Sequence, residues 1–201
     1  MRKKVVLATA NEGKAREFLE LLKDIEVNIL TLKDFPEIVM PEESGSTFTA
    51  NALIKARAVA MATGLPALAD DSGLEVDFLK GAPGVYSARF AGEPSNDLLN
   101  NQKLLQLMAG VPWDKRTARF RCALAMVVPG GKEHIAEGTV EGFIAYEPKG
   151  EYGFGYDPLF YLPAYGKTYA ELGEELKNDL SHRALAVKNL RPVLRELFGE
   201  K

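Results

Sequence analysis

Cysteine is almost absent from this chain, since Cys122 is its only cysteine. One cysteine cannot form an internal disulfide bond, so a disulfide-stabilised scaffold is excluded. Cys122 lies in an apolar run that is typical of a strand, and we expect it to be a buried core residue. The fold must therefore depend on a hydrophobic core, which a chain of 201 residues is long enough to bury.

Long apolar runs are absent as well. The run at residues 5–8 follows Met1-Arg2-Lys3-Lys4 and is too short for the apolar segment of a secretion signal. No stretch approaches the roughly 18 consecutive apolar residues that a membrane-spanning helix needs. We therefore expect a cytoplasmic protein with no membrane partner.

The chain has no strong excess of one charge. It contains 25 Lys and Arg residues against 28 Asp and Glu residues, which gives a net charge of −3. Domains that grip nucleic acid usually carry a marked basic excess, so we expect no nucleic-acid partner. A small anionic ligand is compatible with this balance, because a few local Lys and Arg side chains are enough to bind it. Length and composition predict a single domain over residues 1–201, or two small lobes sharing a core.

The spacing of apolar residues predicts an α/β fold. A strand at residues 5–8 precedes a helix whose Ala15, Phe18 and Leu22 share one face, and a second strand follows at residues 27–32. Strand, helix and strand in this order are typical of α/β proteins. The other predicted elements are helices at residues 48–62, 98–108 and 181–198 and strands at residues 65–69, 117–128, 134–145 and 159–162.

The strand at residues 117–128 carries the clearest alternation in the chain. Its even positions are apolar, whereas Arg119 and Arg121 occupy the other face, so we expect one dry face. The strand at residues 134–145 is expected to be its neighbour, which makes the sheet mixed and partly antiparallel. Pro192 falls inside the last helix and is expected to bend or split it.

The two commonest phosphate-binding motifs, G-x-x-x-x-G-K-[ST] and G-x-G-x-x-G behind a strand, are absent. The first strand instead runs into the turn Thr9-Ala10-Asn11-Glu12-Gly13-Lys14, which opens a helix. A helix N-terminus offers backbone N–H groups and partial positive charge, so it suits a phosphate. Thr9 and Asn11 add side-chain donors, and Lys14 adds a full charge. The alternative interpretation is a capped turn with a solvated lysine.

Adjacent carboxylates follow another apolar strand, in Asp70-Asp71-Ser72-Gly73. This segment stands at the end of the predicted strand, and α/β sheets bind their ligands beyond the carboxyl ends of strands. Neighbouring carboxylates are costly unless a cation lies near them, and Mg²⁺ is a natural partner. Glu42 or Glu43 could complete such a site. The alternative is a turn in which Asp side chains cap backbone N–H groups.

The glycine-rich segment Gly153-Phe154-Gly155-Tyr156-Asp157-Pro158 is a third candidate. Its glycines allow the backbone to approach a ligand closely. Phe154 offers a ring on which a nucleobase can stack, and Asp157 offers an acceptor for ring N–H groups. The alternative is a tight turn with a core aromatic residue.

Basic residues at the start of the last helix are the fourth candidate. Ser181 is typical of an N-cap, and His182 and Arg183 then lie in the first helical turn, where the helix dipole disfavours cations. With Lys177 nearby in sequence, they indicate an acceptor ligand, or else a solvated basic turn. His134 has no such context and is expected to be a surface strand residue.

Taken together and in order, these segments resemble the inosine/xanthosine triphosphate pyrophosphatase family. The resemblance runs from residue 9 to residue 183. The matching stretches are Thr9-x-Asn11-x-x-Lys14, Glu43-x-Gly45-x-Thr47-Phe48, Asn51-Ala52-x-x-Lys55-Ala56, Ala69-Asp70-Asp71-Ser72-Gly73-Leu74, Gly81-Ala82-Pro83-Gly84-x-x-Ser87-Ala88-Arg89, Gly153-Phe154-Gly155-Tyr156-Asp157-Pro158 and Ser181-His182-Arg183.

The resemblance implies an elongated α/β fold with a cleft between two lobes, in a homodimer. It implies Mg²⁺-dependent hydrolysis of ITP, dITP and XTP to the monophosphate and pyrophosphate, which removes them from the nucleotide pool. It places Glu43 and Asp71 at the metal, with Asp70 as a further candidate, and makes Asp71 the general base. The implied substrate-binding residues are Thr9, Ala10, Asn11, Glu12, Gly13 and Lys14 at the triphosphate, Ser72 beside the substrate, and Phe154, Gly155, Tyr156, Asp157, Lys177, His182 and Arg183 around the base.

One position departs from the family pattern. Family members usually have Glu before the Asn51-Ala52 pair, where this chain has Ala50. If that Glu helps to hold the metal, we expect weaker Mg²⁺ binding or slower turnover. Two alternatives stay open: a nucleotide hydrolase with a different base preference, and a nucleotide-binding regulator without turnover.

Overall fold

The computed structural model of the protein describes residues 3–199, without the side chains of residues 174 and 175. The chain divides into two compact units. Unit 1 contains the residues up to Asp71, Cys122–Gly138 and the residues from Arg183 onward. Unit 2 contains Ser72–Arg121 and Thr139–His182. Each unit therefore collects segments that lie far apart in sequence.

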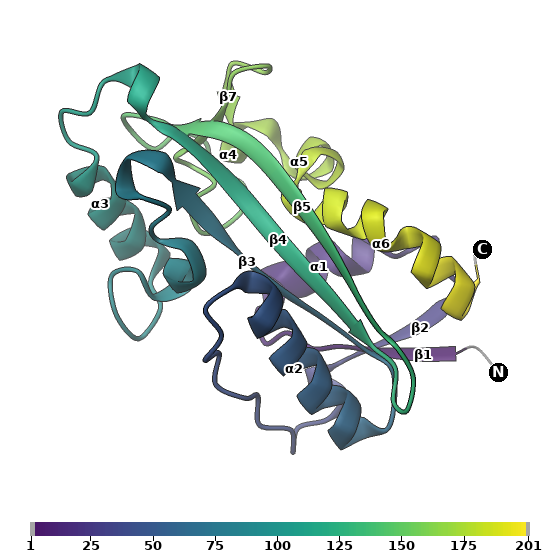
Figure 1. Cartoon of the computed structure of the whole chain (residues 1–201). Helices are drawn as coiled ribbons and strands as arrows, with labels where there is room; N and C mark the ends of the chain where they lie inside the picture. The colour runs from purple at the N-terminus through teal and green to yellow at the C-terminus, as the bar shows by residue number, and fades with distance from the viewer. Residues whose placement is uncertain (1–2, 200–201) are drawn as a thin grey trace. The chain divides into compact units, whose positions relative to one another are not determined.

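The described residues form a seven-stranded sheet with the order β2-β1-β3-β4-β5-β6-β7. β1 is parallel to β2 and β3, whereas β6 is antiparallel to β5 and β7. The prediction of a mixed, partly antiparallel α/β sheet with flanking helices is thus confirmed (Figure 1). The strands are β1 (Lys3–Leu7), β2 (Val27–Thr31), β3 (Ala67–Val76), β4 (Thr117–Val127), β5 (Glu133–Ile144), β6 (Phe160–Leu162) and β7 (Lys167–Thr168).

Six α-helices are found in the described part of the chain. Among the residues that the structure describes, no helix is both long and apolar enough to cross a membrane. Pro192 lies inside the last helix without splitting it, so that alternative was wrong. The helices are α1 (Glu12–Leu21), α2 (Phe48–Thr63), α3 (Asp97–Leu107), α4 (Tyr169–Leu172), α5 (Glu174–Leu180) and α6 (His182–Phe198).

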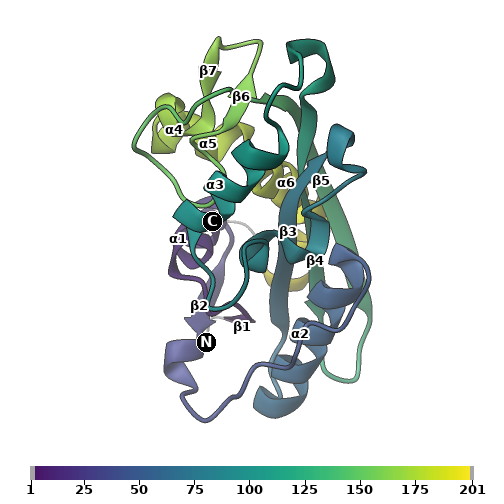
Figure 2. The same cartoon turned by 90° about the vertical axis from the view of Figure 1, so that its left-hand side faces the viewer.

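Unit 1 is a three-layer arrangement with its strands in the middle. One face of the strands packs on α1 and α6, in a core that includes Phe18, Leu68 and Leu190. The other face packs on α2, in a core that includes Ala56 and Ala69. Figure 1 and Figure 2 show α1 and α2 on opposite sides of β3. The alternation of side chains along β3 therefore decides which helix layer each residue faces.

β3 does not end where the sequence predicts. The expected strand stops at residue 69, but the structure continues β3 to Val76, so the alternative of a turn at Asp70 and Asp71 was wrong. Leu74 and Val76 are fully buried, so the core-facing alternation resumes after the polar residues and keeps the segment extended. β1 ends at Leu7, which pairs with Leu68, so the two aspartates lie beyond the carboxyl end of β1.

Unit 2 has its core on one face of the sheet. That core includes Leu74 on β3, Leu104 and Met108 on α3, and Phe120 on β4. On the other face, Arg119 contacts the carboxylates of Glu75 on β3 and Glu141 on β5. The prediction of one dry face therefore holds for the first half of β4. It was wrong for the second half, where residues from Cys122 onward are buried on both faces because α2 covers the second one.

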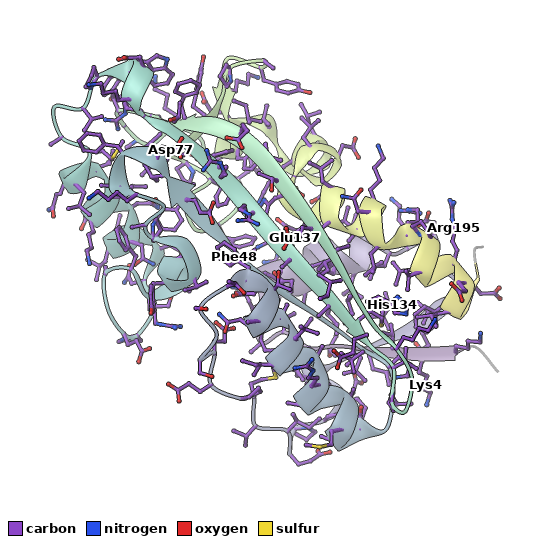
Figure 3. All side chains as sticks on the ribbon, in the orientation of Figure 1. Lys4, Phe48, Asp77, His134, Glu137 and Arg195 are labelled. Carbon is purple, nitrogen blue, oxygen red and sulfur yellow. The ribbon has the colours of Figure 1, made fainter. Side chains whose placement is uncertain are left out.

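Cys122 and His134 differ in their burial. Cys122 is a core residue, with 1% of its surface exposed, as predicted. Burial raises the pKa of its thiol, so it is an inert apolar residue rather than a nucleophile. His134 lies on β5, close to the turn that joins β4 to β5, and is half-buried (Figure 3).

Candidate functional site

The turn between β1 and α1 is held by its own side chains. Asn11 is the N-cap of α1, and its Oδ1 accepts a hydrogen bond of 2.9 Å from the Lys14 N–H. The Thr9 Oγ1 accepts one of 3.2 Å from the Asn11 N–H. This capping supports the predicted start of the helix. A cavity of about 670 Å³ adjoins the turn, lined by Thr9, Ala10, Asn11, Glu12, Ala15, Arg16, Leu19, Thr31, Leu32 and Lys33.

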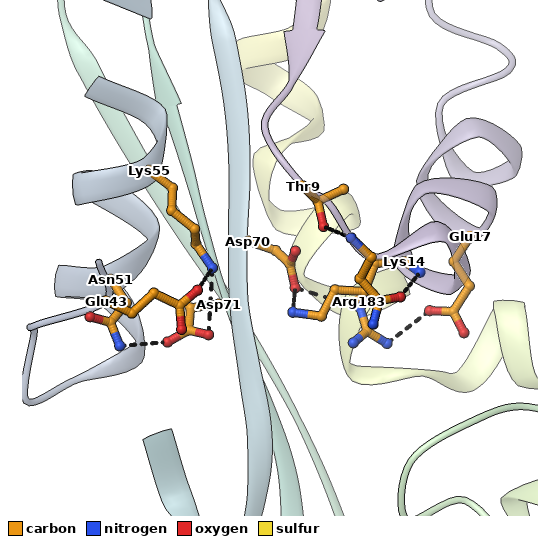
Figure 4. Close-up of polar contacts among 10 residues, drawn as sticks. Thr9, Lys14, Glu17, Glu43, Asn51, Lys55, Asp70, Asp71 and Arg183 are labelled. Atoms are coloured by element: carbon orange, nitrogen blue, oxygen red, sulfur yellow. Dashed lines mark hydrogen bonds and ion pairs between the residues drawn. The ribbon is translucent and has the colours of Figure 1, made fainter. Parts of the chain in front are cut away.

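Lys14 is not the solvated lysine of the alternative interpretation. Its Nζ lies 2.9 Å from Asp70 Oδ2, and only 15% of its side chain is exposed. The Arg183 Nε lies 3.7 Å from the same oxygen, and the Arg183 Nη1 donates a hydrogen bond of 2.8 Å to Glu17. Lys14, Asp70, Arg183 and Glu17 therefore form one buried ion cluster, which we call the basic cluster (Figure 4).

The charge of Asp70 is set by this cluster. Its side chain is buried, which by itself would raise the pKa of the carboxyl group. The charges of Lys14, Arg183 and Lys55 outweigh burial and hold the pKa of Asp70 well below its usual range. Asp70 is therefore a permanent anion that neutralises part of the cationic charge around it.

Asp71 faces the opposite side of β3, toward α2 (Figure 4). Its Oδ2 accepts a hydrogen bond of 2.9 Å from Asn51 Nδ2, and its Oδ1 lies 3.7 Å from the Lys55 Nζ. The Lys55 Nζ also donates a hydrogen bond of 2.5 Å to Glu43 Oε1. Asp71, Glu43, Lys55 and Asn51 form a second group, which we call the acidic cluster.

The pKa values of Asp71 and Lys55 in the acidic cluster are both shifted, in directions that suit proton transfer to Asp71. Burial raises the pKa of Asp71, and the nearby Glu43 charge adds to this, while Lys55 and Lys14 only partly offset it. Burial alone would lower the pKa of Lys55, but the charges of Asp70, Asp71 and Glu43 raise it. Lys55 is therefore a stable cation, whereas Asp71 is a carboxylate with increased basicity.

The loop before α2 brings Glu43 to Asp71. Thr47 is the N-cap of α2 and accepts a hydrogen bond of 3.1 Å from the Ala50 N–H. The Gly45 N–H donates a hydrogen bond of 2.7 Å to Asn51 Oδ1. A Cβ atom at Gly45 would lie 2.6 Å from that oxygen and 2.8 Å from the Ala50 Cβ, so only glycine permits this approach. The Asn51 side chain thus links the Gly45 loop to Asp71.

The donor chemistry of the acidic cluster fits a hard divalent cation. Glu43 and Asp71 supply carboxylate oxygens that converge on a single positive group, the Lys55 ammonium. Among the described side chains, which leave out residues 174 and 175, no three His, Cys, Asp or Glu residues gather closely enough to hold a metal by themselves. Two carboxylates agree with the habit of Mg²⁺, which takes one or two of them together with substrate phosphates.

A third group of predicted residues meets in unit 2. The Asp157 Oδ2 accepts hydrogen bonds from the Phe154 N–H at 2.9 Å and from the Lys177 Nζ at 2.6 Å. The same ammonium lies 4.6 Å from the centre of the Phe154 ring, in a cation–π contact. Gly153 has φ +83°, and a Cβ atom there would overlap Asp157 Oδ2. Phe154, Asp157 and Lys177 form the aromatic cluster.

The remaining predicted residues occupy supporting positions. Tyr156 is buried and its hydroxyl donates a hydrogen bond of 2.8 Å to the Ser87 carbonyl. His182 is 2% exposed, and its ring stacks on Phe120 with centroids 4.8 Å apart and an interplanar angle of 9°. Ser181 precedes α6 with extended dihedral angles, as an N-cap residue does. Ser72 lies on β3, one residue beyond Asp71.

Sequence reasoning missed three residues of these clusters. Asn51 and Lys55 were quoted only as part of a motif, yet they stand at i and i+4 on the buried face of an alanine-rich helix. Polar residues among alanines at this spacing are a recognisable signal, because a buried polar side chain needs a partner. Glu17 carried no such signal, since its pairing with Arg183 joins residues at opposite ends of the chain.

The fold and the three clusters define an α/β protein with paired carboxylates, clustered cations and an aromatic group suited to a nucleotide. The chain belongs to the Ham1 family, whose model matches residues 5–193. This confirms the resemblance that the motifs indicated.

Curated relatives match over nearly the whole chain. The dITP/XTP pyrophosphatase of Desulforamulus reducens is 57% identical over 195 residues, which cover 97% of this chain and 97% of that protein. The dITP/XTP pyrophosphatase of Geobacillus kaustophilus is 51% identical over 199 residues, covering 99% of this chain and 98% of that protein.

Solved structures agree with the fold. A HAM1 protein from Coxiella burnetii has a TM-score of 0.88 at 44% identity, covering 96% of this chain and 99% of its own. A nucleoside-triphosphatase named as dITP/XTP pyrophosphatase, from Mycobacterium abscessus, has a TM-score of 0.77 at 42% identity, covering 94% of this chain and 99% of its own.

Proposed function

We propose that this protein hydrolyses ITP, dITP and XTP to the nucleoside monophosphate and pyrophosphate. The observation that carries the proposal is the acidic cluster, in which the buried Asp71 has a raised pKa beside Glu43 and Lys55. The names of the relatives support the same reaction. In this proposal the protein removes non-standard purine nucleotides from the nucleotide pool.

The triphosphate binds at the turn that opens α1 and at the basic cluster. A nucleoside triphosphate carries about three to four negative charges, so binding needs positioned cations and N–H donors. The N-terminus of α1 supplies donors, and Lys14 and Arg183 supply charge. Asp70 keeps these two cations in place before the substrate arrives. Preorganised charge of this kind spares the enzyme the cost of ordering it during catalysis.

Glu43 and Asp71 hold Mg²⁺ in this proposal. When bound, the ion would neutralise phosphate charge and lower the pKa of a water molecule. Lys55, whose ammonium lies 2.5 Å from Glu43 Oε1 and 3.7 Å from Asp71 Oδ1, balances part of the charge of the two carboxylates. Asp70 as a further ligand stays a prediction, and its pairing with Lys14 and Arg183 speaks for a different role.

Asp71 acts as the general base toward the attacking water. Its raised pKa makes it a better proton acceptor than an ordinary aspartate. The hydrogen bond from Asn51 to Oδ2 fixes the orientation of the carboxylate. Asp71 holds the proton after water attacks phosphorus and pyrophosphate leaves. No covalent nucleophile takes part.

The aromatic cluster recognises the base. Hypoxanthine and xanthine carry a 6-keto acceptor, whereas adenine carries a 6-amino donor at the same position. The base stacks on Phe154, and the Lys177 ammonium, held by Asp157, donates to the keto oxygen. Adenine would present a donor instead of an acceptor to this buried ammonium, and hydrogen-bond sites can reject such analogues by about 10⁴-fold. Direct contact of His182 and Arg183 with the base stays a prediction.

The decisive experiment measures pyrophosphate release from ITP, XTP, GTP and ATP, with and without Mg²⁺. We expect metal-dependent release from ITP and XTP and little from ATP, and little from GTP only if the pocket rejects the 2-amino group of guanine, whose 6-keto group matches that of hypoxanthine. Asp71→Asn should abolish it, and Glu43→Gln should raise the Mg²⁺ requirement. Glu42→Gln, a change at the exposed neighbouring residue, is the matched control and should behave like the wild type.

Other outcomes of this experiment select the alternatives. Release from a different set of nucleotides, such as dUTP and dTTP, would favour a hydrolase of other base preference. Tight ITP binding without release from any nucleotide would favour a nucleotide-binding regulator, in which Ala50, in place of the usual Glu, prevents turnover.

We also propose that the protein is a homodimer and that its two units unfold as one domain. Unit 2 exposes several large apolar side chains, namely Phe78, Tyr86, Leu98 and Leu99, which a second copy could cover. Light scattering should give twice the mass of the chain, and thermal unfolding should give one transition by two different probes. A cytoplasmic location stays a prediction.

A further inference from the structure

Helix α3 forms hydrogen bonds with both backbone polar groups of Gly155, a residue of the turn that carries Phe154 and Asp157. The Gly155 N–H donates a hydrogen bond of 2.8 Å to Asp97 Oδ2. The Asn101 Nδ2 donates one of 2.8 Å to the Gly155 carbonyl oxygen. Asp97 and Asn101 stand at i and i+4, so they lie on one face of α3. Gly155 lies between Phe154 and Asp157, the two residues that the base-binding proposal depends on.

The helix that forms these hydrogen bonds is itself well anchored. Its N-cap Asn96 accepts a hydrogen bond of 3.1 Å from the Leu99 N–H. Leu104 and Met108 are fully buried in the core of unit 2. Asn100, which precedes Asn101 in α3, donates a hydrogen bond of 2.9 Å to the Ala88 carbonyl oxygen. Side chains fixed on such an element can hold a turn to a defined geometry.

The backbone at Gly155 depends on contacts from outside its own turn to keep its conformation. Gly155 has φ +63° and no side chain, so the two peptide units that it joins rotate more freely than they would around any other residue. A rotation of either unit would displace the Phe154 ring and the Asp157 carboxylate relative to each other. The Phe154 N–H to Asp157 hydrogen bond and the Lys177 contact would then be lost.

We propose that Asp97 and Asn101 are positioning residues for base recognition, which act through the Gly155 peptide rather than by touching the base. This inference rests on the proposed function of the aromatic cluster. The pair belongs to unit 2, whereas Glu43, Lys55 and Asp71 belong to unit 1. Loss of the hydrogen bonds from Asp97 and Asn101 to Gly155 should therefore weaken base binding and base selectivity without changing the chemical step.

The test uses the full-length protein with Mg²⁺ and compares four variants. Asp97→Ala and Asn101→Ala each remove one hydrogen bond. Asp97→Asn removes the charge but keeps an acceptor oxygen for the Gly155 N–H, so it should restore the wild-type behaviour. Gln102→Ala changes an exposed residue of the same helix and serves as the control.

We expect each alanine variant to raise the KM for ITP about fivefold, which corresponds to about 1 kcal/mol for one hydrogen bond. The preference for ITP over ATP should fall, and kcat should stay within about twofold of the wild type, as expected when only binding is lost. Calorimetric binding of inosine monophosphate, the product, should weaken by a similar factor. The Gly155 amide should exchange its hydrogen faster in Asp97→Ala.

The outcomes separate this inference from the proposed function. An active wild type whose alanine variants keep the KM and the selectivity would overturn the positioning role. So would a fall in kcat alone, or an Asp97→Asn variant as impaired as Asp97→Ala, because the effect would then come from helix stability or charge. A wild type without pyrophosphate release defeats the proposed function. The binding of inosine monophosphate still decides the positioning role in that case.

Discussion

Replacing Lys55 by methionine tests the charge balance of the acidic cluster. The Lys55 side chain is 9% exposed and lies between Glu43 and Asp71, whose side chains are 29% and 7% exposed. Methionine fills similar volume but leaves two carboxylates without their cation. Removing one partner of a buried ion pair costs about 3–5 kcal/mol, and the partial exposure of Glu43 favours the lower end, about 3 kcal/mol.

This loss can be measured as a shift in melting temperature. For a chain of this size, 1 kcal/mol corresponds to about 2–4 °C, so Lys55→Met should melt about 6–12 °C below the wild type in the presence of a chelator. Mg²⁺ should restore part of this loss, because a bound cation replaces the missing charge between Glu43 and Asp71. The wild type should gain less from Mg²⁺. Lys188→Met, at an exposed position of α6, is the control.

Two results would refute this reasoning. A variant as stable as the wild type in chelator would mean that the Lys55 charge does not offset the two carboxylates. A destabilised variant that gains no more from Mg²⁺ than the wild type would mean that Glu43 and Asp71 do not bind the ion together.

Three further changes have definite expected outcomes. Gly153→Ala places a Cβ atom onto the Asp157 carboxylate, so the KM for ITP should rise at least about tenfold, the effect of about 1.4 kcal/mol; an unchanged KM would contradict the base-binding role. Asn51→Leu removes a hydrogen bond that lowers the pKa of Asp71. The acid limb of the kcat profile, where Asp71 becomes protonated, should therefore move to higher pH, and a limb that stays in place would count against Asp71 as the base. Ala50→Glu should lower the Mg²⁺ concentration for half-maximal rate about tenfold if the added carboxylate supports the metal; an unchanged Mg²⁺ dependence would show that Ala50 costs the chain nothing.

Local signals predicted much of the fold. The turn at residues 9–14 is capped by Asn11, and the helix after residue 47 begins at Phe48 and is followed by Gly64 in the left-handed region, as its sequence indicates. Gly64 has φ +66°, a conformation that glycine adopts without strain. These features depend on residues close together in sequence, so reading them requires no knowledge of tertiary contacts.

The course of β3 could not be predicted in this way. Asp70 and Asp71 have low strand propensity, and a polar pair after an apolar run is typical of a turn. The structure keeps both in a strand because their partners come from other elements: Lys14 and Arg183 on one side, and Lys55 on the other. The cost of burying the carboxylates is offset only by residues that are distant in sequence, so no local pattern records it.

The opposite orientations of Asp70 and Asp71 make two identical neighbours chemically unlike. Asp70 is held as a permanent anion, whereas Asp71 is tuned toward proton acceptance. A deletion or insertion of one residue between Ala67, where β3 begins, and Asp70 would turn each aspartate to the opposite face of β3 and place only one of them where the other had been, while leaving the Asp-Asp pair intact in the sequence. A change in the length of this segment would therefore disturb both clusters. An alignment that shifts the pair by one position would give one aspartate the other's role.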